Sequence, residues 1–269
     1  MLVIRPPSGF AGLGMRDLWR FRELLLFLTW RDIKIRYKQT LLGAAWAVLQ
    51  PFLTMIVFTI VINHIGRVHT PVPYPLFAIS TLALWYYFSN SVNLTSASLV
   101  GSAPLITKVY FPRISVVLSP ILAGLVDFCL AFLLVAGAMI YYGFTPPWHA
   151  LLVPLFVLLA GLMALGLGLV LSALNVSYRD IRYAVPFVLQ LWLWATPVAY
   201  PGGVIPHKYK ILYTANPMTG VVEGYRWALL GTERVQTTHL LISIVTALVL
   251  VVGGAVYFAR AERAFADVI

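Results

Sequence analysis

The chain has 269 residues, of which 61% are hydrophobic and only 10% are charged, and its mean hydropathy is +0.88. A soluble domain carries about 25% charged residues, so this composition excludes a water-exposed globular fold and indicates an integral membrane protein. The net charge of +10 does not indicate nucleic-acid binding, because the basic residues are not gathered in a soluble domain. We assign them to membrane topology and expect no nucleic-acid partner.

Six apolar segments are long enough to cross a bilayer about 30 Å thick as helices. They cover residues 41–65, 75–99, 116–142, 150–174, 183–200 and 238–258. We therefore predict an all-α integral membrane protein with six transmembrane helices. Its parts are a cytoplasmic segment over 1–40, a transmembrane domain over 41–258 and a cytoplasmic tail over 259–269.

The distribution of Lys and Arg predicts the orientation. Fourteen of the 19 lie before Leu41, in the second and fourth connections, and in the tail, whereas five lie on the opposite side. Because cytoplasmic loops are enriched in these residues, both termini are expected in the cytoplasm.

The stretch from Arg16 to Lys38 predicts an amphipathic helix lying in the membrane interface. Polar residues recur at helical spacing, with Phe27 interrupting, at Arg16, Arg20, Glu23, Arg31, Lys34 and Lys38. The apolar face, with Asp32 interrupting, holds Leu18, Phe21, Leu25, Leu28 and Ile35. The alternative is a positively charged anchor with no other role.

The long connection over 201–237 predicts short re-entrant helices that act as an outer gate. Asn216 followed by Pro217 is typical of a helix start, and Gly231 of a helix end. The segment is too apolar for a solvated loop, yet it carries charged residues and so is a poor span. The candidate gate residues are Asn216, Pro217, Glu223, Tyr225 and Arg226. An ordinary amphipathic surface helix is the alternative.

Aromatic residues lie deep in two predicted spans rather than at the interfaces, where belt aromatics gather. Aromatic faces stack against sugar rings and tolerate a sliding substrate, so these residues are candidates for lining a channel. They are Trp85, Tyr86, Tyr87, Phe88, Trp192 and Trp194. The alternative is packing and lipid contact, and of four consecutive aromatic residues on a helix only one or two can face a lumen.

Asp127 is the one acidic residue expected deep in a span, which makes it a functional candidate by default. The sequence offers no basic partner at the same depth, so a proton relay has thin support. The alternative is a hydrogen bond to a neighbouring helix that sets the packing. A further packing signal is the ridge of small residues at Ala160, Ala164, Gly168 and Ser172.

Motifs for nucleotide hydrolysis and metal binding are missing. Gly is nowhere followed by Lys, so the phosphate-binding GxxxxGK[ST] motif is absent, and no HExxH or paired-cysteine spacing occurs. We expect no catalytic residue, no metal and no bound cofactor in this chain. If ATP and Mg²⁺ are used, a partner subunit must use them.

Four sequence runs together resemble a known family. They are WRDIKIRYKQTLLGAAWAVLQP from Trp30, KVYFPR from Lys108, NVSYRD from Asn175, and NPMTGVVEGYRWALLG from Asn216. In this order they resemble the membrane subunit of ABC-2 type polysaccharide exporters, most closely the O-antigen permeases of the Wzm type. The resemblance extends from about Asp17 over nearly the whole chain.

The resemblance implies a homodimer in the bacterial inner membrane with two copies of a separate ATPase subunit. The cargo would be a glycan linked to undecaprenyl diphosphate, moved from the cytoplasm to the periplasm. Candidate ATPase-coupling residues are Arg31, Asp32, Tyr37, Lys108, Tyr110, Pro112, Arg113, Arg179 and Asp180. We hypothesise that the interface helix, joined to the first span without a flexible linker, transmits ATPase closure to that span.

Other functions stay open at this point. Teichoic-acid and capsule exporters share much of the pattern, and an ABC-2 exporter of small hydrophobic drugs is a further alternative. A membrane enzyme would need a cluster of polar catalytic groups at one interface, and the only tight one there is Arg179, Asp180 and Arg182. An ion-coupled carrier is opposed by the scarcity of intramembrane charge.

Overall fold

The computed structural model describes residues 19–38, 43, 45–108, 111–232 and 234–262, and every regular element in that part of the chain is helical. The predicted fold class, all-α, is thus confirmed. The longer elements are α2 (Arg22–Lys38), α3 (Ala45–Phe58) continued by the π-helical η2 (Thr59–Ile65), α4 (Tyr74–Gly101), α6 (Ile114–Tyr141), α7 (Val153–Ser177), α8 (Ile181–Ala195), α10 (Pro217–Leu230) and α11 (Thr237–Ala261). The short ones are α5 (Ala103–Ile106), η3 (Trp148–Leu152), η4 (Gly202–Val204), η5 (His207–Tyr209) and α9 (Lys210–Ala215).

Four helical stretches among the described residues are long and apolar enough to cross a membrane. They are Ala45–Ile65, Ile114–Tyr141, Trp148–Ser177 and Thr237–Ala261. The helix α4 is as long as α6, with 28 residues, but it buries the hydroxyls of Ser80, Thr81, Ser91, Thr95 and Ser96 and is less apolar. The apolar helix α8 has only 15 residues.

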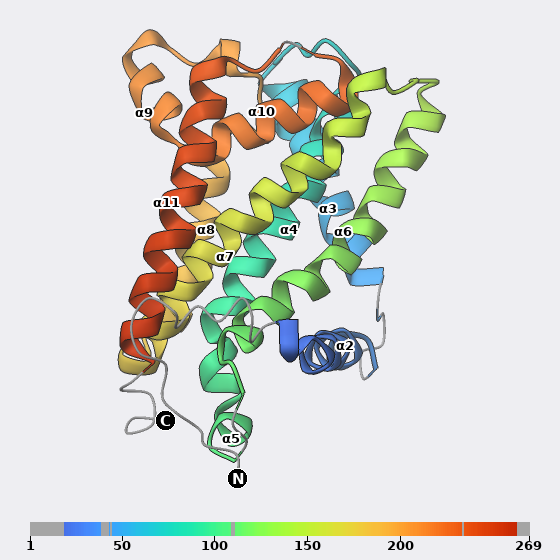
Figure 1. Ribbon diagram of the computed structural model, residues 1–269. Helices are drawn as coiled ribbons and strands as arrows, with labels where there is room; N and C mark the ends of the chain where they lie inside the picture. Colours follow the sequence, from blue (N-terminus) through green and yellow to red (C-terminus); the bar gives the residue numbers. More distant parts are fainter. Residues whose placement is uncertain (1–18, 39–42, 44, 109–110, 233, 263–269) are drawn as a thin grey trace.

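The helices form a bundle with two distinct ends (Figure 1). At one end α2 is seen end-on, at right angles to the long helices, and α5 and the end of α11 lie at this same end. At the other end α9 is a short helix and α10 lies across the bundle. The central pair is α4 and α7, with α6 packed on α4 and α11 on α7.

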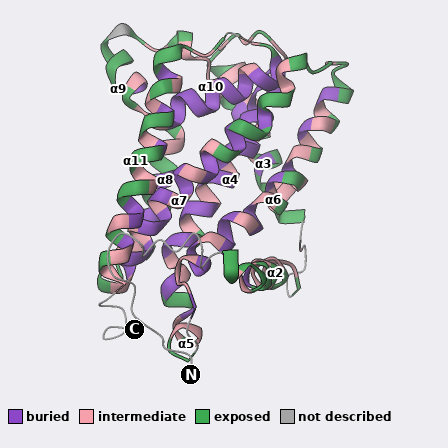
Figure 2. Cartoon of the chain, in the orientation of Figure 1, coloured by how far each residue is buried: buried purple, intermediate pink, exposed green. Residues whose placement is uncertain are grey.

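Burial confirms α4 and α7 as the core of the bundle (Figure 2). The ridge of small residues predicted on α7 lies wholly inside it, since Ala160, Ala164 and Ser172 are fully buried. A Cβ on Gly168 would lie 2.8 Å from Thr95 Cβ of α4. The ridge therefore brings the backbones of α7 and α4 together, as small residues do between membrane helices.

The interface helix α2 buries Leu28 of its predicted apolar face completely, whereas Ile35 of the same face is 68% exposed on the subunit. Asp32 points toward α6, where it has a hydrogen-bond partner, and this contact sets the rotation of α2. Its exposed apolar side chains are Trp19, Leu26, Phe27, Trp30 and Ile35. Arg16 and Leu18 lie outside the described residues.

Candidate functional site

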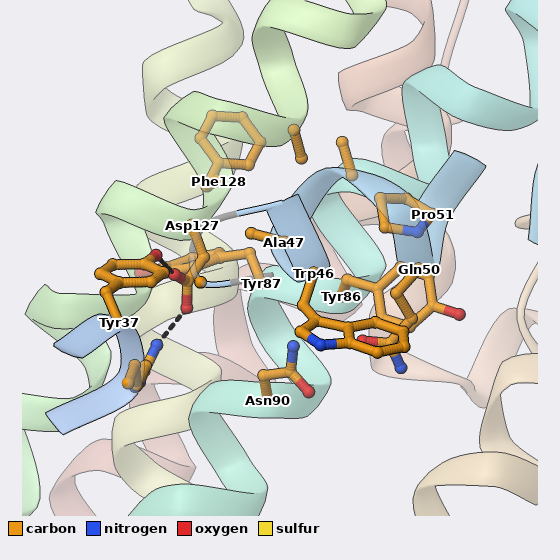
Figure 3. A pocket seen from close by; sticks show the side chains of 14 residues that line it. Tyr37, Trp46, Ala47, Gln50, Pro51, Tyr86, Tyr87, Asn90, Asp127 and Phe128 are labelled. Atoms are coloured by element: carbon orange, nitrogen blue, oxygen red, sulfur yellow. Dashed lines mark hydrogen bonds and ion pairs between the residues drawn. The ribbon is translucent and has the colours of Figure 1, made fainter. Parts of the chain in front are cut away.

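The end of the bundle that carries α2 is organised around Asp127 of α6. Arg36 forms an ion pair with one Asp127 carboxylate oxygen, and the Tyr37 hydroxyl donates a hydrogen bond to the other (Figure 3). The prediction that Asp127 has no basic partner is therefore wrong. The sequence could not show this pairing, because the two groups lie 91 positions apart. The alternative considered above, a contact that sets packing, fits the geometry.

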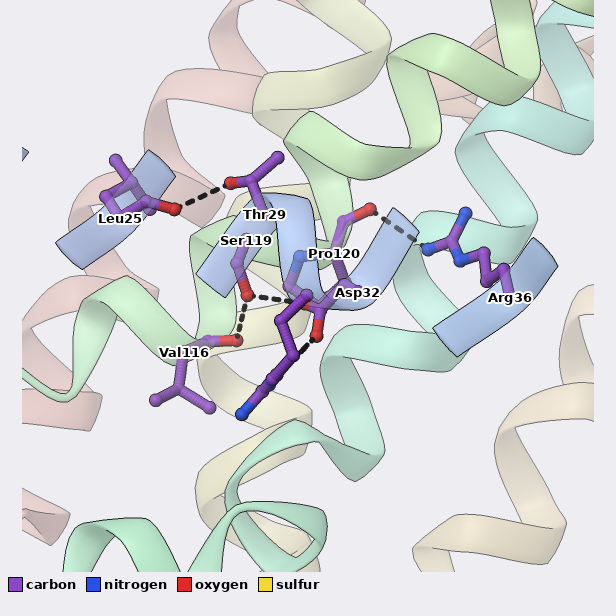
Figure 4. Close-up of polar contacts among 8 residues, drawn as sticks. Leu25, Thr29, Asp32, Arg36, Val116, Ser119 and Pro120 are labelled. Carbon is purple, nitrogen blue, oxygen red and sulfur yellow. Dashed lines mark hydrogen bonds and ion pairs between the residues drawn. The ribbon is translucent and has the colours of Figure 1, made fainter. Parts of the chain in front are cut away.

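A second contact between the same two helices lies one turn away along α2 and about two turns away along α6 (Figure 4). The Ser119 hydroxyl donates to Asp32 Oδ2 at 2.7 Å, and Arg36 Nη2 donates to the Pro120 carbonyl at 3.4 Å. We call these contacts, together with the bonds to Asp127, the α2–α6 clamp. The joint between α2 and α3, at residues 39–42 and 44, lies outside the described residues.

The clamp forms one wall of a cavity of about 240 Å³. Trp46 and Gln50 of α3, Tyr86 and Asn90 of α4, and Asp127 line it (Figure 3). Burial, and then the hydrogen bond to Asp127, raise the pKa of the Tyr37 hydroxyl above its ordinary value, so it stays a proton donor at neutral pH. The cavity combines aromatic faces with amide groups.

The aromatic candidates separate into two groups. Trp85, Tyr87 and Phe88 are 2%, 4% and 0% exposed, so they pack within the subunit rather than on an open surface of it. The rings of Trp85 and Phe88 meet Trp192 edge to face, at 6.3 and 5.4 Å between centroids. That packing explains their burial.

Three aromatic candidates keep an accessible surface. The Tyr86 hydroxyl lies 2.7 Å from Thr54 Oγ1 of α3, beside the cavity at the clamp. Trp194 is 52% exposed and its ring packs against Phe58, with centroids 5.4 Å apart. Trp192 is partly buried and borders an apolar cavity next to α9.

At the opposite end of the bundle, Asn216 joins three elements. Its Oδ1 accepts from Met218 N at 3.0 Å, which caps α10, and from Trp192 Nε1 of α8 at 2.9 Å. Its Nδ2 donates to the Ala195 carbonyl and to Thr196 Oγ1, both at 3.0 Å. The helix predicted between Pro217 and Gly231 is confirmed, and Gly231 ends it in the left-handed region at φ 60°.

Glu223 of α10 is held by two neighbours. The Tyr213 hydroxyl of α9 donates to Oε1, and His239 Nδ1 of α11 lies 2.8 Å from Oε2. Thr214 Oγ1 lies 3.2 Å from the other ring nitrogen of His239. Sequence reasoning missed His239, since a single histidine near a predicted boundary carries no local signal of a partner 16 residues away.

The two other gate candidates are buried. Tyr225 is fully buried and its ring meets Phe128 edge to face. Arg226 is 4% exposed, donates from Nη2 to the carbonyls of Pro197 and Val198, and lies over the Phe77 ring at 3.9 Å. Both residues thus contribute to packing between α10 and its neighbours.

The partner-facing candidates gather at the α2 end. Lys108 is exposed beyond α5, and Arg179 and Asp180 are exposed between α7 and α8. Arg113 donates to the Glu262 carbonyl at 2.8 Å and pairs with its carboxylate at 3.7 Å. Pro112 is partly exposed. Tyr110 lies outside the described residues. Within the described residues, no group of three acidic, His or Cys side chains could hold a metal ion.

Comparison with known proteins agrees with this architecture. The chain is 33% identical over 214 residues to an O-antigen export system permease protein, RfbA, of Myxococcus xanthus, covering 79% of this chain and 82% of the relative. It is 27% identical to a Klebsiella pneumoniae protein of the same name, over 92% of this chain and 95% of that one. A polysialic acid transport protein, KpsM, of Escherichia coli is 24% identical over 88% of this chain and 92% of its own length.

The family match covers the functional elements described above. Residues 23–230 match the family described as ABC-2 type transporter, so the match includes α2, the clamp, the aromatic cluster and α10. This multi-pass membrane protein therefore belongs to the ABC-2 type transporter family.

Proposed function

We propose that this chain is the permease subunit of an ABC exporter that moves a lipid-linked polysaccharide from the cytoplasm to the periplasm. The observation that carries the proposal is the similarity to an O-antigen export permease at 33% identity over most of both chains. The motor is a separate subunit, because no Gly-Lys pair exists in this sequence to form a phosphate-binding loop. ATP and Mg²⁺ belong to that subunit.

The cargo proposed is O-antigen-like glycan on undecaprenyl diphosphate. A capsule polysaccharide is the second candidate, favoured by the similarity to the polysialic acid transport protein. Teichoic acid and small hydrophobic drugs stay as more distant alternatives. The proposed cargo agrees with accessible aromatic surface at Tyr86, Trp192 and Trp194, since sugar rings stack on aromatic faces.

We propose six spans, formed by α3 with η2, α4, α6, η3 with α7, α8, and α11. The bias of Lys and Arg supports placing the α2 end and both termini in the cytoplasm of a bacterial inner membrane. The helices α9 and α10 then lie on the periplasmic side as re-entrant gate helices. Their apolar composition and the burial of most of α10 support this placement.

The outward surfaces of the helices support a homodimer through α3 and α8. Within their apolar sequences both helices expose amides, Gln50 on α3 and Gln190 on α8, which lipid tails disfavour. Between Leu241 and Val252, the exposed positions of α11 are apolar instead: Leu241, Ile244, Val245, Leu248, Val249 and Val252. We therefore place lipid against α11, and a second copy of the chain and a lumen against the exposed surfaces of α3 and α8.

The α2 end is the proposed docking site for two ATPase subunits. Arg31, Lys108, Arg179 and Asp180 are exposed or partly exposed there, next to the clamp. An ATPase pressing on α2 would move α6 through Asp32, Arg36 and Tyr37.

Deleting the gene tests the proposal. Lipid-linked polymer should accumulate on the cytoplasmic face, and a plasmid copy should restore surface polymer. A deletion strain with normal surface glycan and no trapped intermediate would overturn the function. Purified permease that hydrolyses ATP alone would overturn the division of labour between the subunits.

A further inference from the structure

A second cavity, of about 340 Å³, lies at the end of the bundle with α9 and α10. It is lined by the turn at Gly202, by α9 and α10, by the segment after α10, and by the start of α11. The charged groups in its wall are Lys210, Arg226, Arg234, Glu223 and the titratable His239. A volume of this order is typical of small-ligand pockets.

The single carboxylate in this wall is already occupied. Glu223 accepts from Tyr213 through one oxygen, and its other oxygen lies 2.8 Å from His239 Nδ1. The backbone at Gly202 lies so close to the Tyr213–Glu223 pair that a methyl group on Gly202 would collide with the Tyr213 hydroxyl. Glu223 is thus hydrogen-bonded to α9 and α11, and its charge also acts on Arg226, so one carboxylate faces three cations in this wall.

The three cations of the wall form no ion pair among the described residues. Arg226 is the most constrained, since its side chain is buried and its Nε has no hydrogen-bond partner in the part of the chain that is described. Burial lowers its pKa to about 10, which leaves it cationic at neutral pH. A buried guanidinium with an unused donor is costly unless an acceptor completes it.

Lys210, at the start of α9, and Arg234, in the segment between α10 and α11, are both exposed at this cavity. Guanidinium and ammonium groups around a concave surface match phosphate or carboxylate oxygens. We propose that this cavity is an oxyanion-binding site that takes a phosphate or carboxylate group borne by a sugar or by a lipid headgroup. Its placement on the periplasmic side rests on the proposed function.

Binding to the full-length chain in a phosphate-free non-ionic detergent tests the site by titration calorimetry. The probes are glucose 1-phosphate, glycerol 3-phosphate and uncharged glucose. The wild type should bind the two phosphates and not glucose. Tighter binding of the sugar phosphate identifies the cargo as the source of the anion, and tighter binding of glycerol 3-phosphate identifies a lipid headgroup.

The variant K210Q/R234Q should weaken phosphate binding about tenfold or more. Its matched control is K208Q, which removes an exposed charge two residues away, outside the cavity. The single variants K210Q and R234Q should each give a smaller loss, and they keep the test valid if the double variant does not fold. The proposed site would be overturned if K208Q and K210Q/R234Q bound phosphate with equal affinity. It would also be overturned if glucose bound as tightly as the two phosphates, or if the wild type bound neither phosphate at millimolar concentration.

Failure of this site and failure of the proposed function are distinguishable. The binding measurement needs neither cargo nor ATPase, whereas the exporter function is judged by trapped polymer in the deletion strain. Phosphate binding without trapped polymer would keep the site and reject the exporter. Trapped polymer without phosphate binding would keep the exporter and reject the site.

Discussion

Asp127 is the residue on which the α2–α6 clamp depends most. Asp127→Asn removes the charge opposite Arg36 and weakens the bond from Tyr37, in a pair that is about one-fifth exposed on each side. We expect a loss of about 1–3 kcal/mol in the free energy of unfolding, read as a lower melting temperature in detergent. Glu23→Gln, an exposed acid on α2, should change the melting temperature little.

A double-mutant cycle separates the ion pair from general damage to the fold. Arg36→Gln and Asp127→Asn should be less than additive, with a coupling energy of about 1 kcal/mol or more. Additive losses would show that the two side chains do not stabilise one another.

Asn216 is the second residue with a sharp prediction. Asn216→Ala removes both the cap of α10 and the acceptor for Trp192, so it should destabilise by about 1–3 kcal/mol. Asn216→Asp keeps the acceptor oxygen for Met218 and Trp192, but it loses the donations to Ala195 and Thr196 and turns a carboxylate oxygen toward the Ala195 carbonyl. The melting temperature should therefore be highest for the wild type, lower for Asn216→Asp and lowest for Asn216→Ala. Equal losses in both variants would contradict the capping role.

At the scale of elements, the crossing of α7 and α11 depends on glycine. A Cβ on Gly166 would lie 2.6 Å from Leu250 Cβ, so Gly166→Ala should force the helices apart and cost about 1–3 kcal/mol. Gly253 offers a matched control in α11, because a Cβ there meets no atom within 4 Å. Gly253→Ala should raise the melting temperature slightly through helix propensity. The reverse order would exclude close packing at Gly166.

The clamp gives coupling a route through α6, whereas the sequence suggested one through the first span. Asp32→Asn together with Ser119→Ala removes the 2.7 Å bond between α2 and α6. In the complex with its ATPase, this variant should lower export severalfold while ATP hydrolysis persists. A Gly-Ser insertion near Thr40 should be milder. If the insertion abolishes export and the clamp variant does not, the direct joint to α3 transmits the force.

The elements were more predictable than their contacts. Apolar length located the long helices, and Asn216-Pro217 with Gly231 located α10 almost to the residue. The pairing of Arg36 with Asp127 was not predictable, because no local pattern links residues 91 positions apart. The burial of Trp85 and Phe88 depends on the packing of α4 against α8, which the helical period of one segment does not reveal.

For the whole molecule, the exposed surface of α3 and α8 carries the prediction of a homodimer. Their ends meet where the Phe58 ring packs against Trp194, with ring centroids 5.4 Å apart. In a Cys129→Ser background, Val57→Cys on α3 and Leu191→Cys on α8 place thiols on this exposed surface. Both positions are more than half exposed. A short bismaleimide should cross-link the variant carrying both cysteines into dimers in native membranes.

The control for this cross-link is Val249→Cys on α11, which is 62% exposed on the face assigned to lipid. The Val249→Cys variant should migrate as a monomer on the gel, because lipid rather than a second copy surrounds that surface. Dimers from Val249→Cys and none from the α3 and α8 cysteines would move the interface to α11. That outcome would overturn the proposed dimer and the argument from the exposed amides of Gln50 and Gln190 on which it rests.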